Sequence, residues 1–408
     1  MSIRIRRLLG IPGYTSFMIC MMLQGMGISV SSPFLAVYFT SEIGVSAGVF
    51  GIFTAITLIS GVSLSSYIAR RSDHGMNRKT LMVTAMFFNA IAFSGYLFIH
   101  EFYLLLAYMT IFTAIGAPAM PQLFASAREA VNASSSTDHA FANSTLRSMF
   151  SLGFITGPLI GAVLLKHTGF QGIFTGTTLI FVINAVLMLC TAKRPAQAGA
   201  ALVQPKKPLK LHQDARVLIP FLVMTLLYSG HWMNNLNISL FIINTLGGST
   251  QNVATVSSVC ALLEIPFMLL LGILSAKYSN RILLLWGIVL GGVYYVLVLC
   301  SGGLWQIIAG QVLLAFFVAV ISAVGISYIQ DILPDLPGYA STLYTNASTL
   351  GRLSGSLAGG AAAQLLGYRH AYWGCLLLLV AAFVLMIPQS ASLKETSDKS
   401  PIQTGGNP

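Results

Sequence analysis

The stretch ILLLWGIVLGGVYYVLVLC, residues 282–300, contains 19 residues and no charged side chain. A helix that crosses the hydrocarbon core of a bilayer needs about 20 consecutive apolar residues, so this stretch predicts a membrane-spanning helix. Similar runs, separated by short polar stretches, recur along the whole chain, which is 55% hydrophobic and only 8% charged. An ordinary soluble domain carries about 25% charged residues. The sequence therefore predicts an all-α polytopic membrane protein.

Two other architectures do not fit the pattern. A soluble helical protein would have amphipathic helices with a charged face, and these runs have none. A β-barrel would have segments of about 10 residues in which apolar and polar side chains alternate, which this sequence lacks. The five cysteines lie within apolar runs and form no CxxC pair, which is typical of buried thiols. We therefore expect no metal and no other cofactor.

We expect twelve spans in two six-helix bundles. Their approximate bounds are residues 14–39, 47–69, 80–98, 103–127, 139–165, 170–192, 217–246, 253–276, 282–300, 304–329, 340–366 and 371–388. The longest loop contains AQAGAALVQPKKPLK, which is polar and basic, and the last residues have the composition of a disordered tail. The predicted division is an N-terminal bundle (1–192), a basic cytoplasmic linker (193–216), a C-terminal bundle (217–390) and a disordered tail (391–408).

The basic residues predict the orientation of these spans. Eighteen lysines and arginines lie in one set of loops and two in the other, while Arg147 and Arg352 lie inside spans. Cytoplasmic loops carry the excess of Lys and Arg, so we expect both termini in the cytoplasm. The basic N-terminus precedes a long apolar run without a cleavage site, which predicts an uncleaved first span. The net charge of +11 is spread over these loops and not along one face, so we do not expect nucleic-acid binding.

The two halves of the sequence resemble each other. YIARRSDHGMNRKTLM (67–82) follows the second span, and ILSAKYSNRILLL (273–285) follows the eighth. NSTLR opens the fifth span, and NASTLGR lies near the start of the eleventh. Two pseudo-symmetric six-helix repeats are typical of a transporter in which one half rocks against the other around a site in mid-membrane.

The loop ARRSDHGMNRK (69–79) resembles the cytoplasmic signature of the major facilitator superfamily, with Asp73, Gly75, Arg78 and Lys79 in the matching places. This resemblance implies the major facilitator fold. An Asp near a helix N-terminus is stabilised by the helix dipole, and an Arg can hold it through charge-assisted hydrogen bonds. We therefore expect Asp73 and Arg78 to act in gating. The alternative is that the loop carries only ordinary cytoplasmic positive charge.

The fifth span contains GFITGPLIG, with Gly153, Gly157, Pro158 and Gly161. Glycines four residues apart let helices approach closely, and a proline inside a helix removes a hydrogen bond and can kink it. The pattern resembles the antiporter motif of exporters in the superfamily, which implies efflux and a role for these four residues in gating. Helix packing alone is the alternative.

Three further motifs are AMPQLFASARE (119–129), LLEIP (262–266) and IQDILP (329–334), and ASTLYTN (340–346) follows the third. In this order and spacing they resemble the sugar efflux transporter (SET) family within the superfamily, over about residues 14–388. The resemblance implies a bacterial inner-membrane exporter of sugars, sugar-like inducers or glycoside-like compounds, driven by protons.

Glu264 lies near mid-depth of the eighth span. A charge there costs roughly 2.5–3.5 kcal/mol on the insertion scale, and a proton removes that cost. Pro266 frees the carbonyl of Leu262 from its helical hydrogen bond. We expect Glu264 to couple protons, with Arg147 as its cationic partner in one state. The alternatives are a structural Glu and an Arg147 that extends toward the cytoplasm. Arg352 lies at a comparable depth but outside the family pattern, and it ranks lower.

The seventh span, YSGHWMNNLNISLFIIN (228–244), is rich in amides and carries one tryptophan. Sugars offer hydroxyls to amides and C–H faces to aromatic rings. The expected substrate-binding residues are Gln24, Gln122, Asn143, His231, Trp232, Asn234, Asn235, Asn237 and Asn346. Asn237 stands where family members can carry an acid, which leaves more of the proton coupling to Glu264. The alternative is that some amides only hold helices together. Asp331, at the cytoplasmic end of the tenth span, is expected to cap a helix or to gate.

These features predict an exporter of sugars or glycoside-like solutes that works by proton antiport and alternating access. One alternative is a proton-coupled multidrug exporter, which shares the glycine–proline motif, and another is a non-transporting membrane receptor. An enzyme is not expected, because the sequence has no nucleophile–base constellation and no P-loop. The expected partners are a small sugar, protons and the lipid bilayer, and we expect a monomer.

Overall fold

The computed structural model describes residues 8–72, 78–132, 139–191, 215–275, 277–333 and 337–387. The predicted tail (391–408), most of the predicted linker (193–216) and Asp73 lie outside the described residues. Of Arg78 and Asn143 only the backbone is described. The described chain is all-helical, as predicted.

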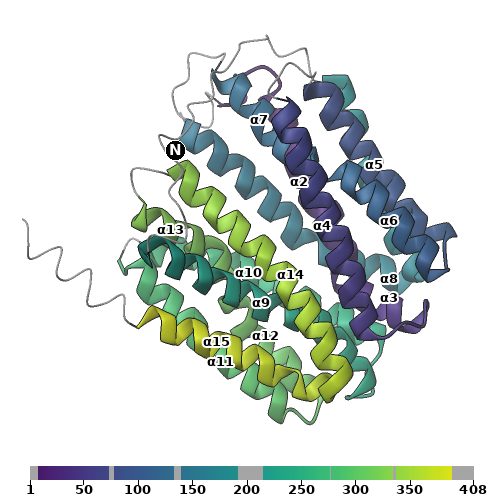
Figure 1. Cartoon of the computed structure of the whole chain (residues 1–408), viewed down its shortest axis with the longest axis vertical. Helices are drawn as coiled ribbons and strands as arrows, with labels where there is room; N and C mark the ends of the chain where they lie inside the picture. Colours follow the sequence, from purple (N-terminus) through teal and green to yellow (C-terminus); the bar gives the residue numbers. More distant parts are fainter. Residues whose placement is uncertain are drawn as a thin grey trace, which may run out of the picture.

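The elements follow one another along the chain as helices and helical turns (Figure 1). In chain order they are α2 (Tyr14–Ser31), η1 (Ser32–Phe34), α3 (Leu35–Ser41), α4 (Ala47–Ser72), α5 (Arg78–Phe98), α6 (Phe102–Gly116), α7 (Ala119–Asn132), α8 (His139–Thr191), α9 (Ala215–Asn244), α10 (Thr250–Leu274), α11 (Asn280–Cys300), α12 (Leu304–Ala319), the π-helical turn η2 (Val320–Val324), α13 (Gly325–Ile332), α14 (Pro337–His370) and α15 (Tyr372–Met386).

Two of these elements contain sharp breaks that set the number of membrane passes. Nine helical segments of the described chain are long and apolar enough to cross a membrane, and the bent pair α14–α15 is a tenth. α8 has 53 residues, or about 80 Å of helix, against a hydrocarbon core of about 30 Å. It breaks at Gly169 (φ 67°), and the pair α14–α15 turns by 105° near Gly367 (φ 81°). Each therefore passes twice, and the twelve predicted passes are confirmed.

Stripes of glycine hold the central helices of each half together. Gly153, Gly157 and Gly161 of α8 lie so close to α2 that an added Cβ would collide with its backbone carbonyl groups. Gly351 and Gly355 of α14 lie in the same way against the backbone of α9. Small residues at a spacing of four permit this approach. The two stripes occupy equivalent spans, the fifth and the eleventh, as expected for pseudo-symmetric halves.

The two halves lie side by side and meet along α4 with α14 and along α8 with α10 (Figure 1). We call the end that carries residues 42–46, 245–249 and 364–371 the closed end. There the Ser46 hydroxyl donates to the side-chain oxygen of Gln364 at 3.3 Å. Deeper in the molecule the Ser239 hydroxyl donates to the carbonyl of Pro33 at 2.8 Å. Both hydrogen bonds join the N-terminal half to the C-terminal half.

Candidate functional site

A cavity of about 100 Å³ lies between the halves, near the middle of the spans. The N-terminal half contributes residues of α2, η1 and α8, and the C-terminal half contributes residues of α9, α10 and α12. We call it the central pocket. Its polar and aromatic lining residues are Ser29, Ser32, Phe154, His231, Trp232, Asn234, Asn235, Ser257, Cys260, Glu264 and Gln311, and Pro158 of the glycine–proline motif lies beside them.

One face of α9 supplies three of the polar side chains. His231, Asn234, Asn235 and Ile238 all line the pocket, and positions three and four apart share a helix face. Asn234 is buried and accepts a hydrogen bond of 3.4 Å from the Tyr294 hydroxyl. The Nδ1 atom of His231 is buried and has no hydrogen-bond partner among the described residues. On this face of α9, the imidazole nitrogen of His231 is therefore the buried polar atom that a ligand could satisfy.

Glu264 also lines the pocket, from α10. Its Oε1 atom accepts a hydrogen bond of 3.5 Å from the Cys260 thiol, one turn earlier on the same helix. The expected pair with Arg147 is not formed in this conformation. The Arg147 guanidinium instead lies 5.8 Å from the Phe124 ring. Arg147 precedes Pro158, which does line the pocket, by about 16 Å along α8. The pairing of these two residues in another state stays a prediction.

Arg352 of α14, which the sequence analysis ranked below Arg147, is the arginine that lies beside a residue of the central pocket. Its guanidinium carbon lies 4.5 Å from the centroid of the Trp232 ring, within the range of a cation–π interaction. Its Nε atom is buried and has no hydrogen-bond partner in the described part of the chain. In the sequence, only the depth of Arg352 in its span indicates a functional role. The sequence does not predict its contact with Trp232, because the packing of α14 on α9 brings the two residues together.

Two of the expected substrate-binding amides hold helices together. Asn237 is fully buried, and its Nδ2 atom donates to the carbonyl of Gly359 on α14 at 3.3 Å. Gln24 is buried as well, and its side-chain oxygen accepts a hydrogen bond of 3.2 Å from Asn184. Neither lines the central pocket. In this conformation, Asn237 and Gln24 therefore join helices, as the alternative interpretation of the amides expects.

The remaining expected substrate-binding residues either lie outside the central pocket or have side chains outside the described part of the structure. Gln122 is buried on α7, and Asn346 is exposed on α14, and neither lines the central pocket. The side chain of Asn143 lies outside the described residues. Sequence reasoning did not select Ser29 or Gln311, although both are buried and line the pocket. An amide inside an apolar run is the feature by which the sequence marks Gln311.

Among the expected gating residues, Asp331 and the three glycines lie in two different regions: at the end of α13 and between α8 and α2. Asp331 accepts a hydrogen bond of 2.7 Å from the Asn280 side chain, which ties the end of α13 to the start of α11. The adjacent Arg281 donates to the carbonyl of Met386 at 2.6 Å, at the last turn of α15. The three glycines of the fifth span pack α8 on α2 within one half. A gating role for any of these residues stays a prediction, as it does for Asp73 and Arg78.

The arrangement contains the parts of a carrier. Among the described residues, no three His, Cys, Asp or Glu side chains gather as metal ligands would. The pocket lies between two pseudo-symmetric helical halves and carries amides, an indole and one carboxyl group. Polar sites at the interface of two membrane repeats are where secondary transporters bind their solutes. These features define the class of the protein as a membrane transporter.

The chain belongs to the Major Facilitator Superfamily, whose sequence model matches residues 17–230 and 220–403. Sugar efflux transporter A of Dickeya chrysanthemi is 28% identical over 380 residues, which cover 92% of this chain and 96% of the relative. Sugar efflux transporter B of Salmonella typhimurium is 28% identical over 371 residues, with 90% and 93% covered. The predicted membership of the sugar efflux transporter family is thereby confirmed.

Solved structures share the fold at much lower identity. The nucleoside transporter NupG superposes with a TM-score of 0.75 at 14% identity, over 93% of this chain and 99% of that one. The peptide transporter POT superposes with a TM-score of 0.72 at 11% identity, over 92% and 94%. At such identities the likeness establishes the architecture of twelve helices and carries no information on the solute.

Proposed function

We propose that the protein exports sugars or glycoside-like solutes by alternating access. The observation that carries this proposal is the central pocket, where Trp232, Asn234 and Asn235 lie together between the two halves. The indole offers a face for the C–H groups of a sugar ring, and the amides both donate to and accept from hydroxyl groups. The names of the relatives support the same solute class.

The sugar is exchanged for a proton carried by Glu264. Its one hydrogen-bond partner among the described residues is a thiol, which is a weak donor and leaves the carboxyl group available to take up or release a proton. One proton that moves down 100 mV supplies about 2.3 kcal/mol. This corresponds to a gradient of roughly fiftyfold for a neutral solute. One carboxyl group is therefore sufficient for useful export.

The closed end faces away from the cytoplasm in this proposal. Lys79 and Arg281 lie at the starts of α5 and α11, at the opposite end of the molecule from Ser46 and Gln364. Cytoplasmic ends carry the excess of basic residues, which supports termini on the cytoplasmic side. The bacterial relatives support a location in the inner membrane. The hydrogen bonds at the closed end then describe the conformation that loads sugar from the cytoplasm. The pocket is built by one chain, so a monomer suffices.

The multidrug alternative predicts a wide and mostly apolar cavity. One face of α9 lines the central pocket with amide and imidazole groups. These groups would remain unsatisfied around a lipophilic cation, and unsatisfied buried groups cost about 1–3 kcal/mol each. This chemistry favours a polyhydroxylated solute over a drug.

Counterflow in proteoliposomes tests the sugar site without reference to protons. Liposomes loaded with unlabelled lactose should accumulate radiolabelled lactose through the wild type. Trp232→Ala should abolish this exchange because it removes the stacking face. Trp286→Ala is the matched control, since that indole is exposed on α11 and its loss should leave exchange unchanged. Equal exchange in Trp232→Ala and the wild type would contradict the assignment of the pocket. Lactose binding without exchange would favour the receptor alternative.

A further inference from the structure

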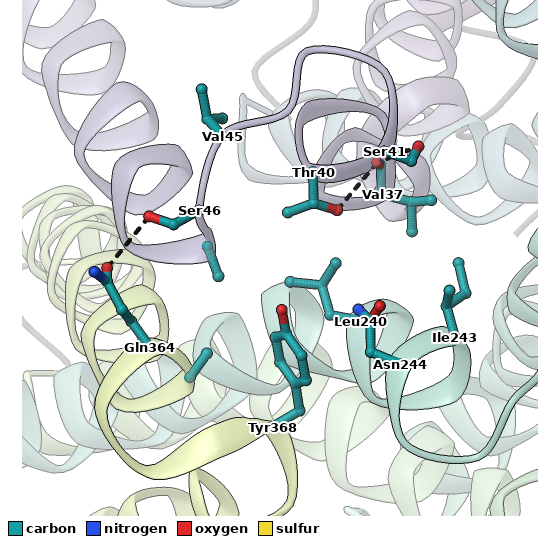
Figure 2. Close-up of a pocket in the computed structure, with 12 residues that line it drawn as sticks. Val37, Thr40, Ser41, Val45, Ser46, Leu240, Ile243, Asn244, Gln364 and Tyr368 are labelled. Atoms are coloured by element: carbon teal, nitrogen blue, oxygen red, sulfur yellow. Dashed lines mark hydrogen bonds between the residues drawn. The ribbon is translucent and has the colours of Figure 1, made fainter.

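A second and larger cavity lies at the closed end, on the far side of the Ser239–Pro33 contact from the central pocket. Its volume is about 400 Å³, which lies in the range of small-molecule binding sites. Its walls come from α3 and the start of α4 in one half and from the ends of α9 and α14 in the other (Figure 2). We call it the release pocket.

Three side chains offer the release pocket hydrogen-bonding groups that have no partner among the described residues; Asn244 and Gln364 are exposed, and Tyr368 is half-buried. The Asn244 amide and the Tyr368 hydroxyl have no hydrogen-bond partner in the described chain, and both lie at the cavity (Figure 2). The side-chain oxygen of Gln364 is held by Ser46, while its amide nitrogen has no described partner. Two further hydroxyls, those of Thr40 and Ser41, donate to carbonyl groups of their own helix and keep lone pairs for a ligand.

The chemistry of the lining specifies the kind of ligand. None of the twelve lining residues is charged, so the cavity offers nothing to pair with an ionic group. It offers two amides, three hydroxyls of serine and threonine, and the phenol ring of Tyr368, beside apolar patches from residues such as Leu240 and Ile243. A ligand with many hydroxyls and apolar C–H faces satisfies this set. Those are the properties of a neutral sugar.

We propose that the release pocket is a second sugar site, which holds a neutral sugar after it leaves the central pocket and before it leaves the protein. This inference rests on the proposed function and adds a site to it. The Gln364 side chain, whose amide nitrogen would donate to the sugar, also ties the two halves together through Ser46. A sugar in this pocket therefore lies directly beside a contact that joins the two halves at the closed end.

Protection of an introduced thiol measures occupancy of the release pocket directly. The background lacks the native cysteines Cys20, Cys190, Cys260, Cys300 and Cys375, each replaced by alanine, and its lactose counterflow is checked first. Ser41→Cys is a nearly isosteric reporter, exposed at the cavity wall. The purified protein is labelled with a maleimide at rising lactose concentrations, with glycine betaine as the osmotic control. At ten times the half-protecting concentration, labelling should slow about tenfold.

Three comparisons separate occupancy of this pocket from other causes of protection. Gly302→Cys, in the exposed turn after α11 and outside the pocket, should label at the same rate with and without lactose. The reporter should still be protected when Trp232→Ala has removed the central site. The double variant Tyr368→Phe, Gln364→Ala should raise the half-protecting concentration roughly tenfold, equivalent to about 1.4 kcal/mol.

Each other outcome overturns the second site. Protection that disappears with Trp232→Ala would mean that lactose acts from the central pocket by changing the conformation. Protection at Gly302→Cys as well would mean a general effect of the sugar on the thiols. Absence of protection in a protein that exchanges lactose would remove the release site and leave the proposed function intact. Absence of both would count against the two proposals together.

Discussion

Glu264 and Arg352 place opposite charges in the middle of the membrane without pairing them. Glu264 is bonded to the Cys260 thiol, and the Arg352 guanidinium lies over the Trp232 ring. An intramembrane ionisable residue is costly and for that reason marks functional sites. Both side chains meet the central pocket or a residue that lines it, so both have a physical reason to affect the solute.

Arg352→Gln should weaken lactose binding by removing the cation from the face of Trp232. A cation–π contact is worth about 0.5–2 kcal/mol, which corresponds to a loss of roughly two- to thirtyfold in affinity. Arg352→Lys keeps the charge without the planar group and should fall between the two. The concentration dependence of lactose counterflow measures the effect, and thermal unfolding of each variant checks folding. An unchanged affinity in a folded Arg352→Gln protein would show that the contact is structural.

Four of the expected substrate-binding residues lie close together on one span. His231, Trp232, Asn234 and Asn235 all line the pocket, and their role in binding stays a prediction. Asn237 lies on the same span but does not line the pocket, and it bonds to Gly359 of α14. Which face of a polar helix meets a cavity depends on the neighbouring helices. A single sequence does not contain that arrangement.

At the scale of elements, the glycine stripes decide how closely the helices pack. The sequence showed the stripe of α8 because a proline and a family motif mark it. The equivalent stripe of α14 lies in GRLSGSLAGG and has no proline beside it, so it was not selected. The π-helical turn η2 between α12 and α13 also had no local signal, because the apolar run continues through it.

Gly355→Ala should destabilise the protein, because a Cβ there collides with the backbone of Ser229 on α9. Overpacking of this kind costs about 1–3 kcal/mol. Gly292→Ala is the matched control: it also replaces a glycine inside a helix, but nothing lies within 4 Å of the new Cβ. That change should be neutral or slightly stabilising. Thermal unfolding in detergent compares the two variants, and equal melting temperatures would contradict the packing role of the stripe.

At the scale of the whole molecule, the composition and the spacing of apolar runs were enough to predict twelve spans in two halves. The relation between the halves was not predictable, because a rocking transporter has more than one stable arrangement of the same helices. The structure has the Ser46–Gln364 and Ser239–Pro33 bonds formed. If alternating access is the mechanism, these contacts must break once in every cycle.

A disulfide across the closed end should therefore stop transport. In the cysteine-free background, Ser46→Cys with Gln364→Cys introduces one thiol on each side of the contact in which the Ser46 hydroxyl reaches the Gln364 oxygen at 3.3 Å. A cysteine is shorter than the glutamine, so formation of the disulfide is first verified by thiol titration after oxidation. Oxidation should abolish lactose counterflow, and a reducing agent should restore it. Each single variant, treated with the same oxidant, should keep its activity. Full exchange by a protein shown to be cross-linked would mean that the closed end does not open during transport.

The central claim is that sugar leaves in exchange for a proton carried by Glu264. The most direct test follows radiolabelled lactose uptake into inside-out vesicles whose interior has been acidified. The wild type should accumulate lactose while the proton gradient lasts. Glu264→Gln should not accumulate it, yet should still exchange lactose by counterflow, which shows that the variant is folded. Accumulation by Glu264→Gln equal to that of the wild type would contradict the proton role of Glu264, and a wild type without acid-driven uptake would contradict sugar–proton antiport for lactose.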